Sequence, residues 1–185
     1  MIDETLLEAM ENMGKAVEHV QAQFIGVRTG RANASLVDKI QVEYFGAFVP
    51  LQQLASFQVP EARMLVVKPH DRGSIAAIEK AIQASDLGLS PSNDGVVIRL
   101  NFPMLTEERR KEFVKVVKNM AEDGRITVRN VRRDARKIFE TAKKDGDISQ
   151  DELDRAEKEL EQLTQATVDT IDKAFTRKEH ELLEV

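Results

Sequence analysis

The sequence has no cysteine among its 185 residues, no tryptophan, and only 5 % aromatic residues. Without cysteine the chain can form no disulfide, no zinc–thiolate site and no thiolate nucleophile. No run of residues approaches the about 18 consecutive apolar residues that a membrane-spanning helix needs. The acidic residues 1–4 do not begin the apolar segment of a signal peptide. We therefore expect a soluble, cytoplasmic protein that does not bind a membrane.

Residues that catalyse reactions or bind metals are also scarce. The three histidines, His19, His70 and His180, are far apart, and none has metal-ligand spacing to another histidine or to a carboxylate. The sequence contains no phosphate-binding glycine loop of the P-loop kind, and no nucleophile motif surrounds a serine or threonine. We expect no metal, no cofactor and no enzymatic activity.

Three segments have the apolar periodicity of long helices that pack side by side. Apolar residues recur at alternating steps of three and four in each of them, which is the heptad spacing of helical bundles. The positions are Leu6, Met10, Met13, Val17, Val20, Phe24 and Val27; then Phe113, Val117, Met120, Gly124, Val128, Val131, Ala135, Ile138 and Ala142; then Leu153, Ala156, Leu160, Leu163, Thr167, Ile171 and Ala174.

The ends of these segments carry helix-capping residues. Asp3 and Thr106 are expected N-caps of the first and second helices, and Ser149 with Glu152 forms the capping box of the third. Asp123-Gly124 could divide the second segment in two. Because the heptad phase continues through it, we predict one unbroken helix to about residue 143.

Residues 31–104 have a different pattern, with short strands in place of heptads. Residues 39–45, 64–67 and 96–100 are typical of strands, and residues 92–95 of a turn. A short amphipathic helix is expected to begin at a Ser74 cap, with Gly88 beyond its end.

These patterns predict an α+β fold in which a long three-helix bundle carries a small inserted β/α/β domain. The bundle comprises residues 1–30 and 105–185, and the inserted β-rich domain with one short helix comprises residues 31–104. Two adjacent linkers join the domains, and a glycine in one and a proline in the other favour a hinge there. The expected hinge residues are Thr29, Gly30, Arg31 and Ala32 in the first linker and Pro103, Met104, Leu105 and Thr106 in the second.

Positive charge is concentrated in one segment of an acidic chain whose formal net charge is −5. Residues 107–144 have 13 Lys and Arg against 7 Asp and Glu, whereas residues 145–185 have 5 against 13. At about 100° per residue, Arg129, Arg132 and Arg136 lie within about 40° of Arg125 on the second helix. Lys111, Lys118 and Lys143 extend this arginine stripe.

Two interpretations of the arginine stripe are open. Charge runs on helices are usually a solvated face or ion pairs with a neighbouring helix, here the acidic third helix. Arginine, however, suits bidentate phosphate contacts, and acidic residues do not alternate with the stripe at i,i+4 spacing. We therefore favour docking on the backbone of a folded RNA, and the absence of interleaved aromatics argues against single-strand stacking.

Two other functions compete with RNA docking. A helical rod that binds another protein would show an exposed apolar seam beyond its core, for which Leu7 and Ile25 are candidates. A hydrolase using His70 beside Asp71 is a weaker alternative, because residues 69–72 are typical of a turn that ends a strand.

Four motifs in order closely resemble the bacterial ribosome recycling factor family. They are RTGRA at 28–32, ASDLG at 84–88, LTEERRK at 105–111 and VRNVRRDA at 128–135, and the resemblance covers essentially the full chain. It implies an L-shaped molecule similar to transfer RNA, with a hinge at the two linkers.

The resemblance also implies a function and partners. Members bind the post-termination ribosome on large-subunit ribosomal RNA and, with elongation factor G and GTP, promote subunit splitting and release of messenger and transfer RNA. The important arginines of the family match Arg110, Arg129 and Arg132. Our full set of candidate rRNA-binding residues is Arg28, Arg31, Arg110, Arg125, Arg129, Arg132, Arg133 and Arg136. We expect the protein to act as a monomer.

The sequence departs from the family pattern at two positions. The family often has proline where this chain has Ala34, and the more flexible alanine would loosen the exit from the first linker. The family commonly has alanine or a similar helix former at the position of Gly124. The glycine of this chain would make the middle helix less stiff.

Overall fold

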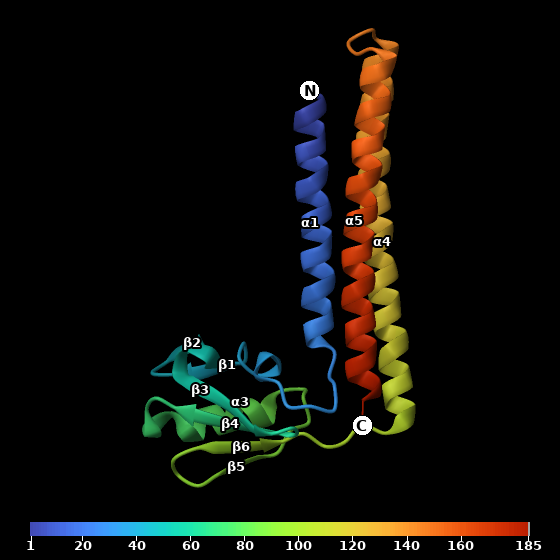
Figure 1. The fold of residues 1–185 in the computed structure, drawn as a ribbon. Helices are drawn as coiled ribbons and strands as arrows, with labels where there is room; N and C mark the ends of the chain where they lie inside the picture. Colours follow the sequence, from blue (N-terminus) through green and yellow to red (C-terminus); the bar gives the residue numbers. More distant parts are fainter. Residues whose placement is uncertain (185) are drawn as a thin grey trace. The chain divides into compact units, whose positions relative to one another are not determined.

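The computed structural model describes residues 1–184 and contains two compact units. The first unit comprises residues 1–27 and 111–183, and the second comprises residues 28–110 with Glu184. Both units appear in Figure 1, where the helices of the first unit are drawn in blue, yellow and orange to red. Their internal architecture confirms the predicted α+β fold with a helical bundle and an inserted β-rich part.

Helices α1 (Ile2–Gly26), α4 (Glu107–Lys144) and α5 (Gln150–Leu183) run side by side in the first unit (Figure 1). They share one apolar core, which confirms three long helices joined through a heptad-like seam. Its fully buried large side chains are Met13, Val20, Phe139, Leu160, Ile171 and Leu182.

Two of the three predicted helix caps are confirmed. The backbone N–H of Arg109 donates to Thr106 Oγ1 over 3.1 Å at the start of α4. At the start of α5, Ser149 and Glu152 exchange both hydrogen bonds of a capping box, with N···O distances of 2.7 and 3.2 Å. The Asp3 cap was wrong, because α1 already begins at Ile2 and Asp3 lies in its first turn, where its charge favours the helix dipole.

The predicted core was wrong at two of its large apolar residues. Met10 is 51 % exposed and Ile138 is 46 % exposed, whereas their neighbours Ala9 and Phe139 are buried. Both neighbours also satisfy a three-and-four spacing, so the periodicity alone could not choose between them. In α1 the small alanines at 9 and 16 lie in the seam, which lets the helices approach closely.

Gly124 lies at a point of close helix approach inside the unbroken α4. A Cβ atom at this position would lie 2.3 Å from Val20 Cγ2 of α1 and 3.5 Å from Ile171 Cδ1 of α5. Real Cβ atoms essentially never come within 3.0 Å of another heavy atom, so Val20 fills the space that a side chain would need. The glycine at position 124 is therefore explained by packing. Val20 of α1 and Ile171 of α5 pack against α4 at the residue where its helix propensity is lowest.

The second unit contains two antiparallel sheets and one helix of ten residues. Sheet one pairs β1 (Gln41–Tyr44) with β2 (Ala47–Pro50), and sheet two has the order β3-β4-β6-β5. The remaining elements are η1 (Ala34–Leu36), α2 (Leu51–Leu54), β3 (Ala55–Glu61), β4 (Met64–Pro69), η2 (Arg72–Ser74), α3 (Ile75–Ala84), β5 (Pro91–Asn93) and β6 (Ile98–Asn101). One apolar core joins α3 to both sheets through residues that include Val42, Leu65, Val67, Ile78, Ile82, Ile98 and Leu100.

Three of the six strands in the described chain match the predictions, as β1, β4 and β6. β1 ends one residue early because Phe45 and Gly46 form the hairpin turn with positive φ. β2, β3 and β5 were missed. β3 is an edge strand with a register shift and mostly exposed side chains, so it has no clear apolar alternation. β5 includes two residues of the predicted turn at 92–95, and the turn itself is narrower.

Helix α3 differs from the prediction at its start, whereas Gly88 lies beyond its end as predicted. Ser74 occupies the N-cap position, but its hydroxyl donates to the Asp71 carbonyl over 2.6 Å and makes no capping bond. The helix ends at Ala84, and Gly88 lies four residues later in a separate left-handed turn.

Exchange of Gly124 for alanine should destabilise the bundle. Alanine gains about 1 kcal/mol of helix propensity, but overpacking against Val20 costs about 1–3 kcal/mol, so we expect a net loss of about 1 kcal/mol. Gly14 is the matched control, because it lies in α1 and a Cβ there meets nothing within 4 Å. Gly14→Ala should raise the free energy of unfolding by about 0.5–1 kcal/mol in urea melts.

The double variant Val20→Ala/Gly124→Ala separates clash from propensity. In the smaller Val20→Ala background, Gly124→Ala should become neutral or stabilising. Equal stabilisation by Gly124→Ala and Gly14→Ala in the wild-type background would contradict the close approach.

Candidate nucleic-acid interface

The arginine stripe lies along the middle of α4, beside α5. Its side chains differ in exposure, from 17 % for Arg125 through 39 % for Arg132 and 47 % for Arg129 to 60 % for Arg136. Lys118, one and a half to two turns earlier, is also exposed. The three outer arginines can therefore reach a ligand in solvent, while Arg125 is mostly covered.

Helix α5 places a carboxylate opposite three of these arginines. Arg125 Nε lies 2.7 Å from Asp172 Oδ1, Arg132 lies 3.3 Å from Glu161, and Arg136 Nε lies 3.2 Å from Glu157 Oε1. The residue numbers of the carboxylates fall as those of the arginines rise, as expected of antiparallel helices. We call these three ion pairs the α4–α5 ladder. The interpretation as ion pairs to the acidic third helix therefore describes part of the stripe.

Acidic residues of α4 itself also contact the stripe. Glu122 accepts from Arg125 and Arg129, each over 3.1 Å, and Arg136 lies 3.0 Å from Glu140 at i,i+4. The hydrogen bonds from Arg129 and then Arg125 lower the pKa of Glu122. The expectation that no acid alternates with the stripe was wrong, because Glu122 and Glu140 lie only about 60° round the helix from Arg125 and their side chains reach the arginines.

Arg133 and Arg110 lie near the stripe but are held differently. Arg133 is 73 % exposed, and its closest acidic oxygen belongs to the adjacent Asp134 at 3.9 Å. Arg110 is half-buried in the first turns of α4, and its Nε is shielded from solvent without a hydrogen-bond partner in the described chain. Arg133 is thus an open cation, whereas Arg110 is partly fixed.

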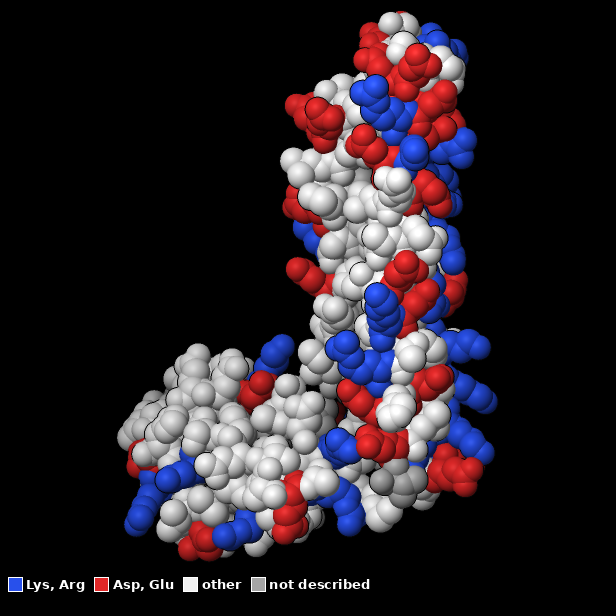
Figure 2. Space-filling view, viewed as in Figure 1, with Lys and Arg blue, Asp and Glu red and all other residues white. Residues whose placement is uncertain are grey.

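The bundle surface consequently carries both signs of charge close together. Figure 2 shows acidic and basic side chains close together on the visible face of the bundle, with several basic side chains in succession along its lower right edge. The sorting of charge seen on one helix is therefore moderated once α5 is in place. A phosphate ligand would meet arginines that already have carboxylate neighbours.

Alternative chemistry finds little support among residues 1–184. No group of three His, Cys, Asp or Glu residues in that range could hold a metal ion. Asp71 accepts from the Gly73 backbone N–H over 2.9 Å and from the Tyr44 hydroxyl over 3.1 Å, so its carboxylate stabilises the turn after β4. The bond to Asp71 raises the pKa of Tyr44. No helix in the described range has the length and apolar character to cross a membrane.

Comparison with known proteins gives one consistent result. The sequence model of the family described as Ribosome recycling factor matches residues 20–183. The chain belongs to the ribosome recycling factor family. Curated ribosome-recycling factors of Thermobifida fusca and Kineococcus radiotolerans are 56 % and 54 % identical to it over 185 residues, with full coverage of both chains.

Solved structures of the family agree. A solution structure of the ribosome recycling factor has a TM-score of 0.82 and 41 % identity, and the match covers 100 % of this chain and 98 % of that one. A second match has a TM-score of 0.71, 43 % identity and 99 % coverage of both chains. It is described as models for the T. thermophilus ribosome recycling factor and the E. coli elongation factor G bound to the E. coli post-termination complex.

In this family member, both linkers are anchored to the turn between β3 and β4. The Ala32 N–H donates to the Ala62 carbonyl over 2.7 Å, and the Phe102 N–H donates to the Arg63 carbonyl over 2.8 Å. The segments that contain the expected hinge residues lie outside helices and strands. Thr106 is the N-cap of α4, so of the expected hinge residues in the second linker only residues 103–105 precede the helix cap.

The Arg28 side chain is hydrogen-bonded to the second linker and is not a free, solvent-exposed cation. Its Nη2 donates to the Pro103 carbonyl over 2.9 Å, and its guanidinium carbon lies 5.9 Å from the centre of the Phe102 ring. Burial lowers the pKa of Arg28. Arg28 is among the expected rRNA-binding residues, but its contacts with the second linker favour a structural role. Arg31 is exposed, and its backbone N–H donates to Thr29 Oγ1 over 3.2 Å.

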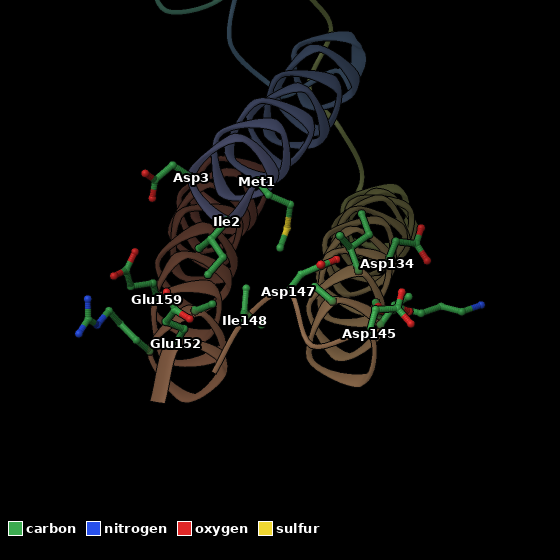
Figure 3. Close-up of a pocket in the computed structure, with 15 residues that line it drawn as sticks. Met1, Ile2, Asp3, Asp134, Asp145, Asp147, Ile148, Glu152 and Glu159 are labelled. Atoms are coloured by element: carbon green, nitrogen blue, oxygen red, sulfur yellow. The ribbon is translucent and has the colours of Figure 1, made fainter. Parts of the chain in front are cut away.

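A groove of about 1060 Å³ lies at the end of the bundle that carries the N-terminus of α1 and the turn between α4 and α5 (Figure 3). Ile2, Ile138 and Ile148 give it an apolar wall, which explains the exposure of Ile138. Its charged lining is mostly acidic: Asp3, Asp134, Asp145, Asp147, Glu152 and Glu159 against Lys137 and Arg155. The groove therefore does not favour phosphate.

Leu7 and Ile25, the predicted exposed apolar residues, are 61 % and 50 % exposed.

Removal of the Arg28 guanidinium should loosen the second linker. In Arg28→Ala, we expect faster amide hydrogen exchange at Phe102 than in the wild type, because the Pro103 carbonyl loses its donor and the Phe102 ring loses its cover. Arg31→Ala is the control, since it removes a guanidinium from the first linker that pairs with Glu184 over 2.8 Å and has no bond to Pro103. Unchanged exchange at Phe102 in Arg28→Ala would show that the Arg28 side chain does not hold the linker.

Proposed function

We propose that this protein recycles ribosomes after termination of protein synthesis. It would bind the post-termination ribosome on large-subunit rRNA and, with elongation factor G and GTP, promote subunit splitting and release of messenger and transfer RNA. The observation that carries the proposal is full-length similarity to ribosome-recycling factors, at 56 % identity, together with an arginine stripe on the longest helix. A family structure described with elongation factor G on a post-termination complex supports the two partners.

The protein would contribute shape and RNA contacts, and the GTPase would supply the free energy. We propose that it acts in the cytoplasm, where ribosomes are found, and carries out no chemistry of its own. The absence of a P-loop motif in the sequence supports dependence on a separate GTPase.

We propose that the outer arginines of α4 are the RNA contacts. Arg129, Arg132, Arg133 and Arg136 are each at least 39 % exposed, and an exposed ion pair contributes only about 0–1 kcal/mol. Such arginines can turn to a phosphate at little cost. Arg125 is better suited to bracing α4 against α5, because it is 17 % exposed and has two carboxylate partners. Arg110 could reach RNA from the start of α4.

The two linkers are the proposed hinge. Their attachment to the β3–β4 turn would transmit a push on the inserted domain to residues 29–31 and 103–105. A GTPase could then move that domain while the bundle stays on rRNA.

Arg132→Ala tests the RNA surface. We expect affinity for isolated large ribosomal subunits to fall about tenfold, because a charge-assisted contact worth about 1.4 kcal/mol is lost. The slope of log K against log salt should also decrease by about one. Co-sedimentation at several salt concentrations gives both values, and circular dichroism checks that the helices are intact.

Arg155→Ala is the matched control, since it removes an arginine from α5 at the acidic groove, away from the stripe. Equal affinities of wild type and Arg132→Ala would disprove the assignment of the stripe. A flat salt response of the wild type would favour the alternative, a helical rod that binds protein.

A further inference from the structure

The carboxylates of the α4–α5 ladder lie on one face of α5. At about 100° per residue, Glu161 and Asp172 fall within about 60° of Glu157. The opposing arginines span a similar arc of α4. Two complementary stripes on antiparallel helices therefore meet along their length, and this alignment extends from residue 125 to residue 136 of α4.

The pairs of the ladder differ in strength. The Arg125–Asp172 pair has the shortest separation, 2.7 Å, and the most buried arginine. The Arg132–Glu161 pair is the longest, 3.3 Å, with side chains 39 % and 61 % exposed. Because exposed pairs are weak, the outer part of the ladder can open while the Arg125 pair keeps α4 against α5.

An arginine in this ladder meets two competing acceptors when RNA arrives. Its five N–H donors can serve a carboxylate or a phosphate, and a carboxylate that stays in place repels the approaching phosphate. In either case the carboxylate lowers the affinity for RNA. A factor that must leave the ribosome after each round benefits from a lowered affinity for RNA. This step rests on the proposed function.

We propose that Glu161 and Glu157 of α5 compete intramolecularly with RNA phosphates for Arg132 and Arg136. They hold the affinity for rRNA low enough for release. They are therefore residues that set affinity and lifetime on the ribosome, although they carry the same sign of charge as the ligand.

Glu161→Gln tests the proposal by removing charge at constant shape. Binding to isolated large subunits should tighten about two- to fivefold, the factor that matches an exposed ion pair, and the dissociation rate should fall. Glu157→Gln/Glu161→Gln should tighten binding further. Glu159→Gln is the matched control, because it makes the same charge change at an exposed position about 160° round α5 from Glu161. It should leave the affinity close to that of the wild type.

A double-mutant cycle assigns the effect to the arginine. In an Arg132→Ala background, Glu161→Gln should give no more gain than Glu159→Gln, because the arginine for which Glu161 competes is absent. Equal gains from both glutamine variants in the wild-type background would overturn the proposal. So would weaker binding of Glu161→Gln, since Glu161 would then hold Arg132 in place for RNA.

The same data separate this proposal from the proposed function. If Arg132→Ala leaves binding unchanged, the RNA surface itself is wrongly assigned. If Arg132→Ala weakens binding but Glu161→Gln matches Glu159→Gln, only the competition is wrong.

Discussion

The close approach of α1 to α4 at Gly124 is the constraint on which the bundle depends. Val20 occupies the place of a side chain at this position, and Ile171 of α5 lies nearby. Since α4 contacts both other helices here, an apolar strip of its surface is consumed by the core. Its thirteen cations must be distributed over the remaining surface. Packing thus determines which face of α4 is left for the arginine stripe.

The same packing places the stripe beside the acidic helix α5. Arg125 is drawn into the helix contact and becomes structural, while Arg129, Arg132 and Arg136 stay half-exposed. The resulting surface is weakly neutralised, which suits a ligand with strong, regularly spaced negative charge and disfavours lasting attachment. Stability and the proposed reversible RNA binding share one helix because its arginines differ in depth.

Much of the fold could be predicted from the sequence, because heptads, capping residues and strand alternation are local signals. The α4 helix, its Thr106 cap and the Ser149–Glu152 capping box were all predictable in this way. Strand β3 was not, because its mostly exposed side chains and its register shift leave no apolar alternation to recognise. The arginines of the stripe could be found by angle, but the pairing with Glu161 required the position of α5, and the hydrogen bond from Arg28 to Pro103 joins residues 75 apart. Gly124 could be noticed but not explained.

Directed hydroxyl-radical probing tests the central claim, that the arginine stripe of α4 faces rRNA. The absence of native cysteine allows one iron chelate to be attached at Lys118→Cys, on the stripe, or at Asn130→Cys, exposed and about 120° round the same helix. With the protein bound to the large subunit, the account predicts strong, localised rRNA cleavage from position 118 and weak cleavage from position 130. Equal cleavage from both positions, or stronger cleavage from 130, would contradict it.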